Sequence, residues 1–367
     1  MIAQEAIHPA ESVPLSRDCR IERGRGVHWI NPLEHSDWDE QIAGRNSGAH
    51  SFFHGTAWAK VLTETYGYEP VYFVSGETGA VLPLMEVDSP LTGQRGVALP
   101  FTDVCEPLCA DRVEFHKLFR NAVELGVARG WKYIEFRGGE PSFNGAAPSL
   151  AFYGHSIEIP PDEETFISQL KNPVRRAIRK AEKSGVRVEI SRDLEAVKQY
   201  YVLHCQSRKR HGLPPQPFSF FRNIHRHALL DGSGMVVLAH WGKVPVAGAM
   251  FLHSGDKAIY KFGASDDTFQ HLRGNNLVFR EAIGWLSRNG FKKLDLGRTS
   301  IVNEGLRRFK LGWNADETTI RYYRFCLRQK NFVSMRDEGS GWHNQIFKKL
   351  PLSISRIAGE ILYRHWA

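Results

Sequence analysis

The feature that most constrains the fold is a module that occurs twice. "ARGWKYIEFRGG" (128–139) and "SRNGFKKLDLGRT" (287–299) each contain the end of a helix, a glycine, an aromatic residue and a lysine, followed by alternating apolar and acidic residues. Glu135 and Asp295 occupy the same place in the two copies. One strand pair earlier, "TGAVLPLMEV" also resembles "VPVAGAMFLH". A chain of 367 residues has room for two such units, so we expect an internal duplication of an α+β unit of about 130–160 residues.

The order of predicted elements is the same in both halves. In the first, a helix has apolar residues at helical spacing from Trp58 to Tyr66 and ends at Gly67. Two strands within 71–87, a helix over 112–129 and a strand in "WKYIEFRGG" follow it. In the second half we predict three strands, then a helix over 275–290 capped by Asn275 or Asn276, then a strand in "FKKLDLG". The three strands are Met235–His240, Val246–His253 and Lys257–Gly263.

A basic helix is predicted between the halves, in "LKNPVRRAIRKAEKSGVRVEI". One stripe is apolar, and the neighbouring row is crowded with like charges, which is mildly destabilising unless an anion lies across it. The helix is either a solvated face or a phosphate-facing surface. The apolar stripe is Val174, Ile178 and Ala181, and the basic residues are Arg175, Arg176, Arg179, Lys180 and Lys183.

Charge and cysteine usage limit the class of protein without selecting one. The net charge of +8 fits anionic substrates, RNA or an acidic membrane surface. The five cysteines have no metal-ligand spacing, so we expect buried free thiols and no metal. No signal peptide and no apolar run of about 20 residues is visible, which predicts a cytoplasmic protein.

The C-terminal segment "LPLSISRIAGEILYRHWA" predicts a short amphipathic helix. Its apolar face would contain Ile354, Ile357, Ile361 and Leu362. We expect this face to dock onto the body of the protein rather than onto a membrane, although peripheral contact with the inner face of a membrane remains the alternative.

Two stretches of the second half could carry chemistry, while the G-x-S-x-G, H-E-x-x-H, Walker A and G-x-G-x-x-G patterns are absent. "QHLRGNNLVFREAI" leads a glycine turn into a helix start, which is either an anion site beside Arg273 or a plain Asn-capped helix. "DLGRTSIVNEGLRRFKLGW" follows a strand end and encloses Lys310 between Phe309 and Leu311. A partly enclosed lysine either stabilises a developing oxyanion or forms a structural ion pair.

These stretches together resemble a known family. "AIGWLSRNGFKKLDLGRT", "EGLRRFKLGW", "YKFGASD", "RRAIRKAEKSGV" and "HGTAWAKVL" are similar to the FemAB-like branch of the acetyltransferase (GNAT) superfamily, over roughly residues 28 to 330. That branch includes peptidoglycan-bridge aminoacyltransferases and acetyltransferase-like proteins associated with exopolysaccharide or PEP-CTERM export systems. The resemblance implies an α/β fold with two tandem GNAT-like domains, each a mixed twisted sheet flanked by helices.

The resemblance also implies a division of the chain. We expect a loose N-terminal tail (1–26), a first GNAT-like domain (27–160), a second one (161–330) that contains the basic linker helix (171–184), and a C-terminal helical tail (331–367).

The same resemblance implies roles for particular residues. Lys310 would stabilise the oxyanion beside Phe309, and Asp103 matches an acidic residue of the first domain. Lys60 and Arg210 match substrate-binding cations, and Tyr260 matches a substrate-contacting tyrosine. The turn with Arg273, Gly274, Asn275 and Asn276 would hold the phosphates of a donor. The long two-helix arm of Gram-positive aminoacyltransferases is absent, and this turn has fewer glycines than a coenzyme A loop, so acyl-CoA and aminoacyl-tRNA both remain open as donors.

The resemblance implies an acyltransferase of a cell-envelope or exopolysaccharide precursor. The acceptor would be an amine or hydroxyl on a phosphate-bearing glycan or lipid-linked precursor, with tRNA as a possible partner and no role for DNA. The two alternatives are an acetyl-CoA-dependent N-acetyltransferase of a sugar or small amine, and a non-catalytic RNA- or anion-binding protein built around the basic helix.

Overall fold

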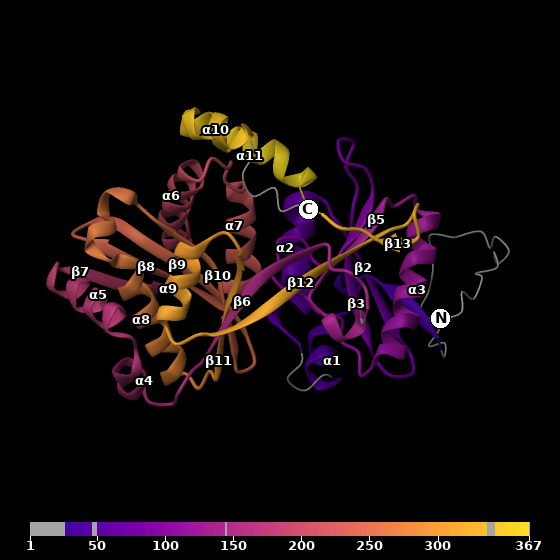
Figure 1. The fold of residues 1–367 in the computed structure, drawn as a ribbon, viewed down its shortest axis with the longest axis horizontal. Coiled ribbons are helices and arrows are strands. Elements are labelled where there is room, and N and C mark those ends of the chain that lie inside the picture. Colours follow the sequence, from indigo (N-terminus) through magenta and orange to yellow (C-terminus); the bar gives the residue numbers. More distant parts are fainter. Residues whose placement is uncertain (1–25, 46–49, 144, 336–341, 367) are drawn as a thin grey trace.

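One continuous mixed sheet organises the molecule (Figure 1). The computed structural model describes residues 26–45, 50–143, 145–335 and 342–366. Within these ranges the sheet has thirteen strands in the order β1-β2-β3-β4-β5-β12-β6-β11-β10-β9-β8-β7, and β13 pairs with β12. Helices cover both faces of the sheet, as expected for an α/β protein.

The first half of the chain contributes six of these strands. Its elements are β1 (Val27–Ile30), η1 (Pro32–Glu34), α1 (Trp38–Arg45), η2 (Phe52–His54), α2 (Thr56–Tyr66), β2 (Glu69–Ser75), β3 (Val81–Val87), β4 (Arg95–Val97), α3 (Arg112–Ala128), β5 (Tyr133–Arg137), η3 (Glu140–Phe143) and β6 (Leu150–Glu158). Gly67 adopts a φ of 74° and ends α2 where the sequence predicts it.

The second half runs through the same succession of elements. They are α4 (Glu163–Gln169), α5 (Asn172–Lys183), β7 (Val186–Ser191), α6 (Leu194–Arg210), α7 (Phe218–Ile224), η4 (His225–Leu229), β8 (Gly234–Trp241), β9 (Val244–Ser254), β10 (Lys257–Ser265), η5 (Asp267–Leu272), α8 (Gly274–Arg288), β11 (Lys293–Ser300), α9 (Glu304–Gly312) and β12 (Asp316–Cys326). The C-terminal elements are β13 (Asn331–Phe332), α10 (Trp342–Lys349), α11 (Leu352–Leu362) and η6 (Tyr363–His365).

The strand order is symmetric about its centre. Counted from the two edges, β1 to β5 correspond to β7 to β11, and the parallel pair β4–β5 corresponds to the parallel pair β10–β11. The last strand of each half crosses to the other half, because β12 pairs with β5 and β6 pairs with β11. The predicted fold class, two tandem α/β units with mixed sheets, is therefore confirmed.

The exchange of strands affects how the two halves can be separated. β6 lies before residue 160 but joins the sheet of the second half, and β12 lies before residue 330 but also pairs with the first half. The predicted domain boundaries at 160 and 330 therefore stay predictions. Most of the predicted N-terminal tail (1–26) lies outside the described residues.

The halves also share a hydrophobic core, because α2 of the first half packs against α7 of the second. Trp58 on α2 is fully buried, and its ring lies 5.7 Å from that of Phe220 on α7 in an edge-on arrangement. A second core packs α5 and α8 onto the sheet around Trp313, and a third packs α3 against β2 and β5. The seam between the halves is thus fixed by buried side chains on one side of the sheet.

Two local features of the second half are defined by the structure. The stretch that contains Lys310 forms a helix, α9, and Asn303 caps its start by accepting a hydrogen bond from the Leu306 backbone N–H. The N-cap of α8 is Arg273 rather than Asn275 or Asn276, because the helix already begins at Gly274.

Candidate active site

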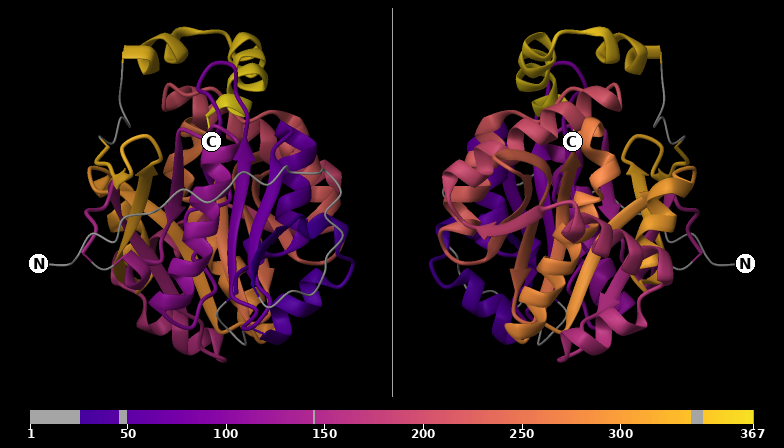
Figure 2. Two further views of the ribbon diagram at one scale, coloured as in Figure 1. Left: turned by 90° about the vertical axis from the view of Figure 1, so that its right-hand side faces the viewer. Right: turned by 90° about the vertical axis from the view of Figure 1, so that its left-hand side faces the viewer.

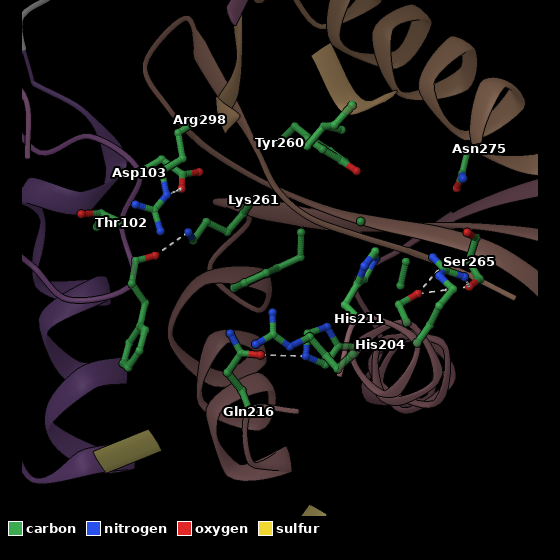
Figure 3. A pocket seen from close by; sticks show the side chains of 18 of the residues that line it. Thr102, Asp103, His204, His211, Gln216, Tyr260, Lys261, Ser265, Asn275 and Arg298 are labelled. Atoms are coloured by element: carbon green, nitrogen blue, oxygen red, sulfur yellow. Dashed lines mark hydrogen bonds and ion pairs between the residues drawn. The ribbon is translucent and has the colours of Figure 1, made fainter. Parts of the chain in front are cut away.

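A cavity of about 580 Å³ opens at the seam between the two halves. The first half contributes the loop Phe101–Asp103 and Arg137, and the second contributes the end of α6, the strand β10, the start of α8, and α9. The C-terminal segment contributes Tyr363 and Trp366. Figure 3 shows side chains from these separate elements converging on one space.

The cavity is strongly cationic. Its described lining has one carboxylate, Asp103, and five basic side chains, which are Arg137, Arg208, Arg210, Lys261 and Arg298. Burial lowers the pKa of His204 to about 3, so this lining residue is neutral, and it shares a hydrogen bond of 2.7 Å with Gln216. A concave surface with excess positive charge and low-dielectric walls favours phosphate or carboxylate ligands.

Lys261 enters the cavity because the strand that carries it is irregular. The pairing of β10 with β9 shifts between Tyr260 and Phe262, so Lys261 is the extra residue of a β-bulge. Such a bulge changes the direction of a side chain. The ammonium donates a hydrogen bond of 2.5 Å to the Phe101 carbonyl and lies 4.9 Å from the centre of the Phe262 ring.

The environment of Lys261 is unusual for a lysine. The residue is only 8% exposed, and burial lowers the pKa of its ammonium while the charge of Asp103 opposes that shift. Within the described residues no carboxylate lies within ion-pair distance of it. A buried cation with an incomplete set of partners is a candidate for binding an anionic group of a substrate.

Asp103 is held against the end of β11. Arg298 Nε lies 3.6 Å from Asp103 Oδ1 (Figure 3). The Arg298 guanidinium also lies over the Phe152 ring, 4.4 Å from its centre. The neighbouring Gly297 has a φ of 70°, and a Cβ at this position would collide with the Asp103 carboxylate. Glycine is therefore required here for both its backbone conformation and its lack of a side chain.

Lys310 lies behind the wall of this cavity rather than in its described lining. Its ammonium donates hydrogen bonds of 2.9 Å to the Gly297 carbonyl and 3.1 Å to the Arg298 carbonyl. Burial lowers its pKa to about 8, against the opposing charges of Asp103 and Asp295. These two backbone carbonyls accept hydrogen bonds from an ammonium group that can donate three.

One residue at the start of α8 lines the cavity. Asn275 is among the lining residues, whereas Arg273 is exposed and Gly274 is buried against β9. Arg273 adopts a left-handed φ of 63°, and no side chain caps the helix. Uncapped N–H groups at a helix start, with no acidic residue in the first turn, can receive an anion.

The structure brings together most of the other predicted site residues. Arg210, Tyr260 and Phe309 line the cavity. Arg210 forms an ion pair of 2.8 Å with Asp267 at the cavity edge, and the Tyr260 and Phe309 rings pack on Phe279 at 4.7 Å and 5.1 Å. Lys60 is not brought to the site, since it is exposed on α2 and absent from the described lining.

Several site residues could not be identified from the sequence. Lys261 sits in a strand whose alternation gives no sign of a bulge. Arg137 ends β5 and Arg298 lies within β11, and neither stands in a motif that marks a site. Tyr363 and Trp366 belong to a segment that the sequence assigns only to a tail. For Lys261 the one available signal is a charged residue flanked by aromatic residues inside an apolar run.

The basic helix α5 lies away from this cavity. Val174, Ile178 and Ala181 are buried as predicted, which turns the basic row outward into solvent. A shallow hollow of about 410 Å³ contains Arg175 and Arg179 together with Glu163 of α4, so its charges are mixed.

Metal and membrane-spanning elements were also searched for in the described residues. No cluster of three or more histidine, cysteine or acidic side chains there could hold a metal ion. In the same part of the chain no helix is both long and apolar enough to cross a bilayer. The free cysteines described are Cys105 and Cys205, which are buried, and Cys109 and Cys326, which are partly buried, while Cys19 lies outside the described residues.

Comparison with known proteins agrees with this geometry. Residues 168–317 match the family model described as "Acetyltransferase (GNAT) domain". FemX has a similar structure, with a TM-score of 0.63 and 16% identity over 83% of this chain and 98% of that one. A tandem GNAT protein from the clavulanic acid biosynthesis pathway matches at a TM-score of 0.52 and 10% identity, over 82% of this chain and 98% of that one.

A third structure is the C-terminal domain of a putative lysylphosphatidylglycerol synthetase from Agrobacterium fabrum. It matches at a TM-score of 0.53 and 13% identity, over 80% of this chain and 92% of that one. No curated protein matches the sequence significantly.

Proposed function

We propose that this chain, which carries a GNAT acetyltransferase domain within a tandem GNAT fold, transfers an activated acyl or aminoacyl group to an amine or hydroxyl of a phosphate-bearing acceptor. The observation that carries the proposal is the cavity at the seam, whose described lining has five basic side chains and a single carboxylate. The acceptor class that fits best is a cytoplasmic cell-envelope or exopolysaccharide precursor, either a phosphorylated glycan or a lipid-linked one.

The chemistry requires one bond to form and one to break. The acceptor nitrogen or oxygen attacks the carbonyl carbon of the donor, and the carbonyl oxygen becomes an oxyanion. When the oxyanion collapses, the bond to the donor's sulfur or ribose oxygen breaks, and this leaving group takes up the proton that the acceptor has lost. Asp103 is the lining carboxylate and therefore the group that we assign to accept the proton of the attacking atom.

We assign stabilisation of the oxyanion to Lys310, with Phe309 shaping the adjacent wall. The charges of Asp103 and Asp295 favour the ammonium form of Lys310, which is the form that an oxyanion requires. Lys261 is the matched alternative, since it is also a buried ammonium and its side chain reaches the cavity itself. We expect Lys261 to bind a phosphate or carboxylate of the substrate, together with Arg210 and Arg298.

The donor is expected to lie along α8. Asn275 and the uncapped helix start can receive a phosphate of acyl-CoA or of aminoacyl-tRNA. The match of residues 168–317 to a GNAT domain favours the second candidate function, an acetyl-CoA-dependent N-acetyltransferase of a sugar or small amine.

A thermal-shift screen tests both candidates. Acyl-CoA thioesters, aminoacyl-tRNA and nucleotide-sugar precursors are each added to the full chain, and a ligand at about 100 times its Kd should stabilise it by about 2.7 kcal/mol. A response to acyl-CoA alone selects the N-acetyltransferase, and a response to aminoacyl-tRNA selects the aminoacyl transferase. If none of these compounds raises the Tm, the proposed function is wrong.

A further inference from the structure

The outer face of the C-terminal helices is apolar and uncovered. On α11, Ile354, Ile357 and Ile361 are 49%, 58% and 58% exposed. The opposite side of the helix packs onto the body, where Ser355 is fully buried and Gly359 lies against the Pro215 carbonyl. The predicted docking of the isoleucine face is therefore wrong: the helix docks, but through its small residues, and its isoleucines face outward.

Other apolar side chains extend this face. Ile346 on α10 is 48% exposed, and Trp366 after η6 is 43% exposed. Leu91, which is 67% exposed, is at the tip of the loop between β3 and β4, and Thr92 and Arg95 of that region donate hydrogen bonds to the His365 carbonyl. Figures 1 and 2 show the loop and the two helices at the same end of the molecule. We call these six residues, Leu91, Ile346, Ile354, Ile357, Ile361 and Trp366, the tail surface.

Exposed cations accompany the tail surface. Lys348 and Lys349 end α10, and Arg364 lies in η6. In the described part of this segment, residues 342–366, Glu360 is the one acidic residue. Separated bulky apolar side chains with lysine and arginine beside them are the composition of a helix that lies in the interface of an anionic bilayer.

We propose that the tail surface docks onto an anionic membrane surface, with α11 lying in the plane of the interface. A second copy of the chain fits less well, because a symmetric contact through this surface would bring two sets of the cations Lys348, Lys349 and Arg364 into one interface. The cations complement lipid phosphates instead, and each adds about 1 kcal/mol of attraction to such a surface.

The position of the tail surface gives the docking a consequence for the reaction. Tyr363 and Trp366 belong to the same C-terminal segment, and both line the cationic cavity. A docked molecule would hold the cavity next to the bilayer, where a lipid-linked, phosphate-bearing acceptor is found. This consequence rests on the proposed function, but the docking itself does not.

Vesicle sedimentation of the full chain tests the docking. Phosphatidylcholine vesicles are compared with vesicles that also contain phosphatidylglycerol, and we expect binding to the anionic vesicles only. The triple variant Ile354→Ser/Ile357→Ser/Ile361→Ser should lower that binding at least tenfold, and Lys348→Glu/Lys349→Glu should lower it by about tenfold or more. The matched control is Val113→Ser/Val127→Ser, which removes equally exposed apolar residues from α3 and should bind as the wild type does.

The outcomes separate this proposal from its rivals. Circular dichroism and Tm should be unchanged in the isoleucine variant, since its side chains are outside the core. The proposal is overturned if the wild type does not sediment with anionic vesicles, if the isoleucine variant sediments like the wild type, or if light scattering shows a dimer that this variant dissociates. Lys310→Met should bind vesicles as the wild type does. Vesicle binding therefore tests the docking even if the catalytic proposal is wrong.

Discussion

The two halves of the molecule have the same strand order, but the helices that start beside their parallel strand pairs differ. α3 in the first half is capped by Asp111, which accepts a hydrogen bond from the Glu114 N–H at 2.9 Å, while Glu114 accepts one from the Ala110 N–H at 2.7 Å. Both side chains are acidic, and they accept hydrogen bonds from backbone N–H groups around the helix start. The corresponding helix of the second half, α8, has no acidic residue and no side-chain cap at its start.

The acidic residue of the repeated module shows the same contrast. Glu135 is buried between two arginines, Arg137 at 3.0 Å and Arg324 at 2.5 Å. Although burial opposes ionisation, these cations lower the pKa of Glu135. Asp295 accepts a hydrogen bond of 2.7 Å from the Gly297 N–H, and its burial raises its pKa.

The difference suggests a division of labour after duplication. In the first half, Asp111 caps the helix start and arginines pair with the buried Glu135. We therefore interpret this half as a scaffold that supplies Asp103 and Arg137 to the cavity. In the second half the helix start has no side-chain cap, and Asp295 accepts a hydrogen bond from the Gly297 backbone N–H. The predictions below test this contrast, either between the two halves or between residues of the second half.

The largest effect is expected from Glu135→Gln. The change leaves Arg137 and Arg324 without their carboxylate in a buried site, and breaking such a pair costs about 3–5 kcal/mol. Urea denaturation at neutral pH should show this loss of unfolding free energy. A loss below about 1 kcal/mol would contradict the assignment of Glu135 as a structural anion.

Asp295→Asn is the matched control and should cost much less. The direction of the pH dependence also distinguishes the two acids. Because the pKa of Glu135 is lowered on folding, its stabilisation is present at neutral pH and is lost as the pH falls below its ordinary value of 4.5. Because the pKa of Asp295 is raised, its contribution is greatest at low pH and is lost as the pH rises through its folded-state value.

The next effect concerns catalysis. Lys310→Met should lower kcat by about 10²–10³ and leave the fold intact, since removing one oxyanion donor typically costs that much. Lys261→Met is the comparison, and we expect it to raise KM more than it lowers kcat, because its proposed role is to bind substrate charge. If Lys261→Met abolishes kcat while Lys310→Met does not, the two lysines must exchange roles.

This comparison also shows how far the sequence could lead. The duplication, the helix–glycine–strand modules and the buried stripe of α5 follow from short-range periodicity, and they predicted the tandem fold. The site depends on longer-range events that periodicity does not encode. A bulge redirects Lys261, the two last strands cross between the halves, and a C-terminal segment brings Tyr363 to a cavity formed by residues more than 50 positions away.

Lys60 and Lys310 illustrate the same limit. Both were assigned from motifs, which fix the helix but not the direction of a side chain relative to a cavity formed by another element. Lys60 lies on the solvent side of α2, and Lys310 points to two backbone carbonyls.

A smaller effect is expected from pH. Lys310 must carry its proton to stabilise an oxyanion, and burial lowers its pKa to about 8. The protonated fraction is complete well below that value, so kcat should fall as the pH rises above about 8, approaching a tenfold loss per unit. Lys310→Arg keeps its charge, so this variant should lack the alkaline fall, and a wild-type profile without that fall would argue against the role of the ammonium.

The smallest effect tests the two helix starts against each other. Asn275→Asp adds a negative charge where the start of α8 meets the cavity, and it should weaken binding of a phosphate-bearing ligand by about tenfold, which corresponds to about 1.4 kcal/mol. Asp111→Asn at the start of α3 keeps a capping side chain and should change neither binding nor Tm by a comparable amount. Isothermal titration of both variants decides the matter. Equal affinities would mean that α8 does not face the ligand, and the contrast between the two halves would then lie in Lys310 and Asp295 alone.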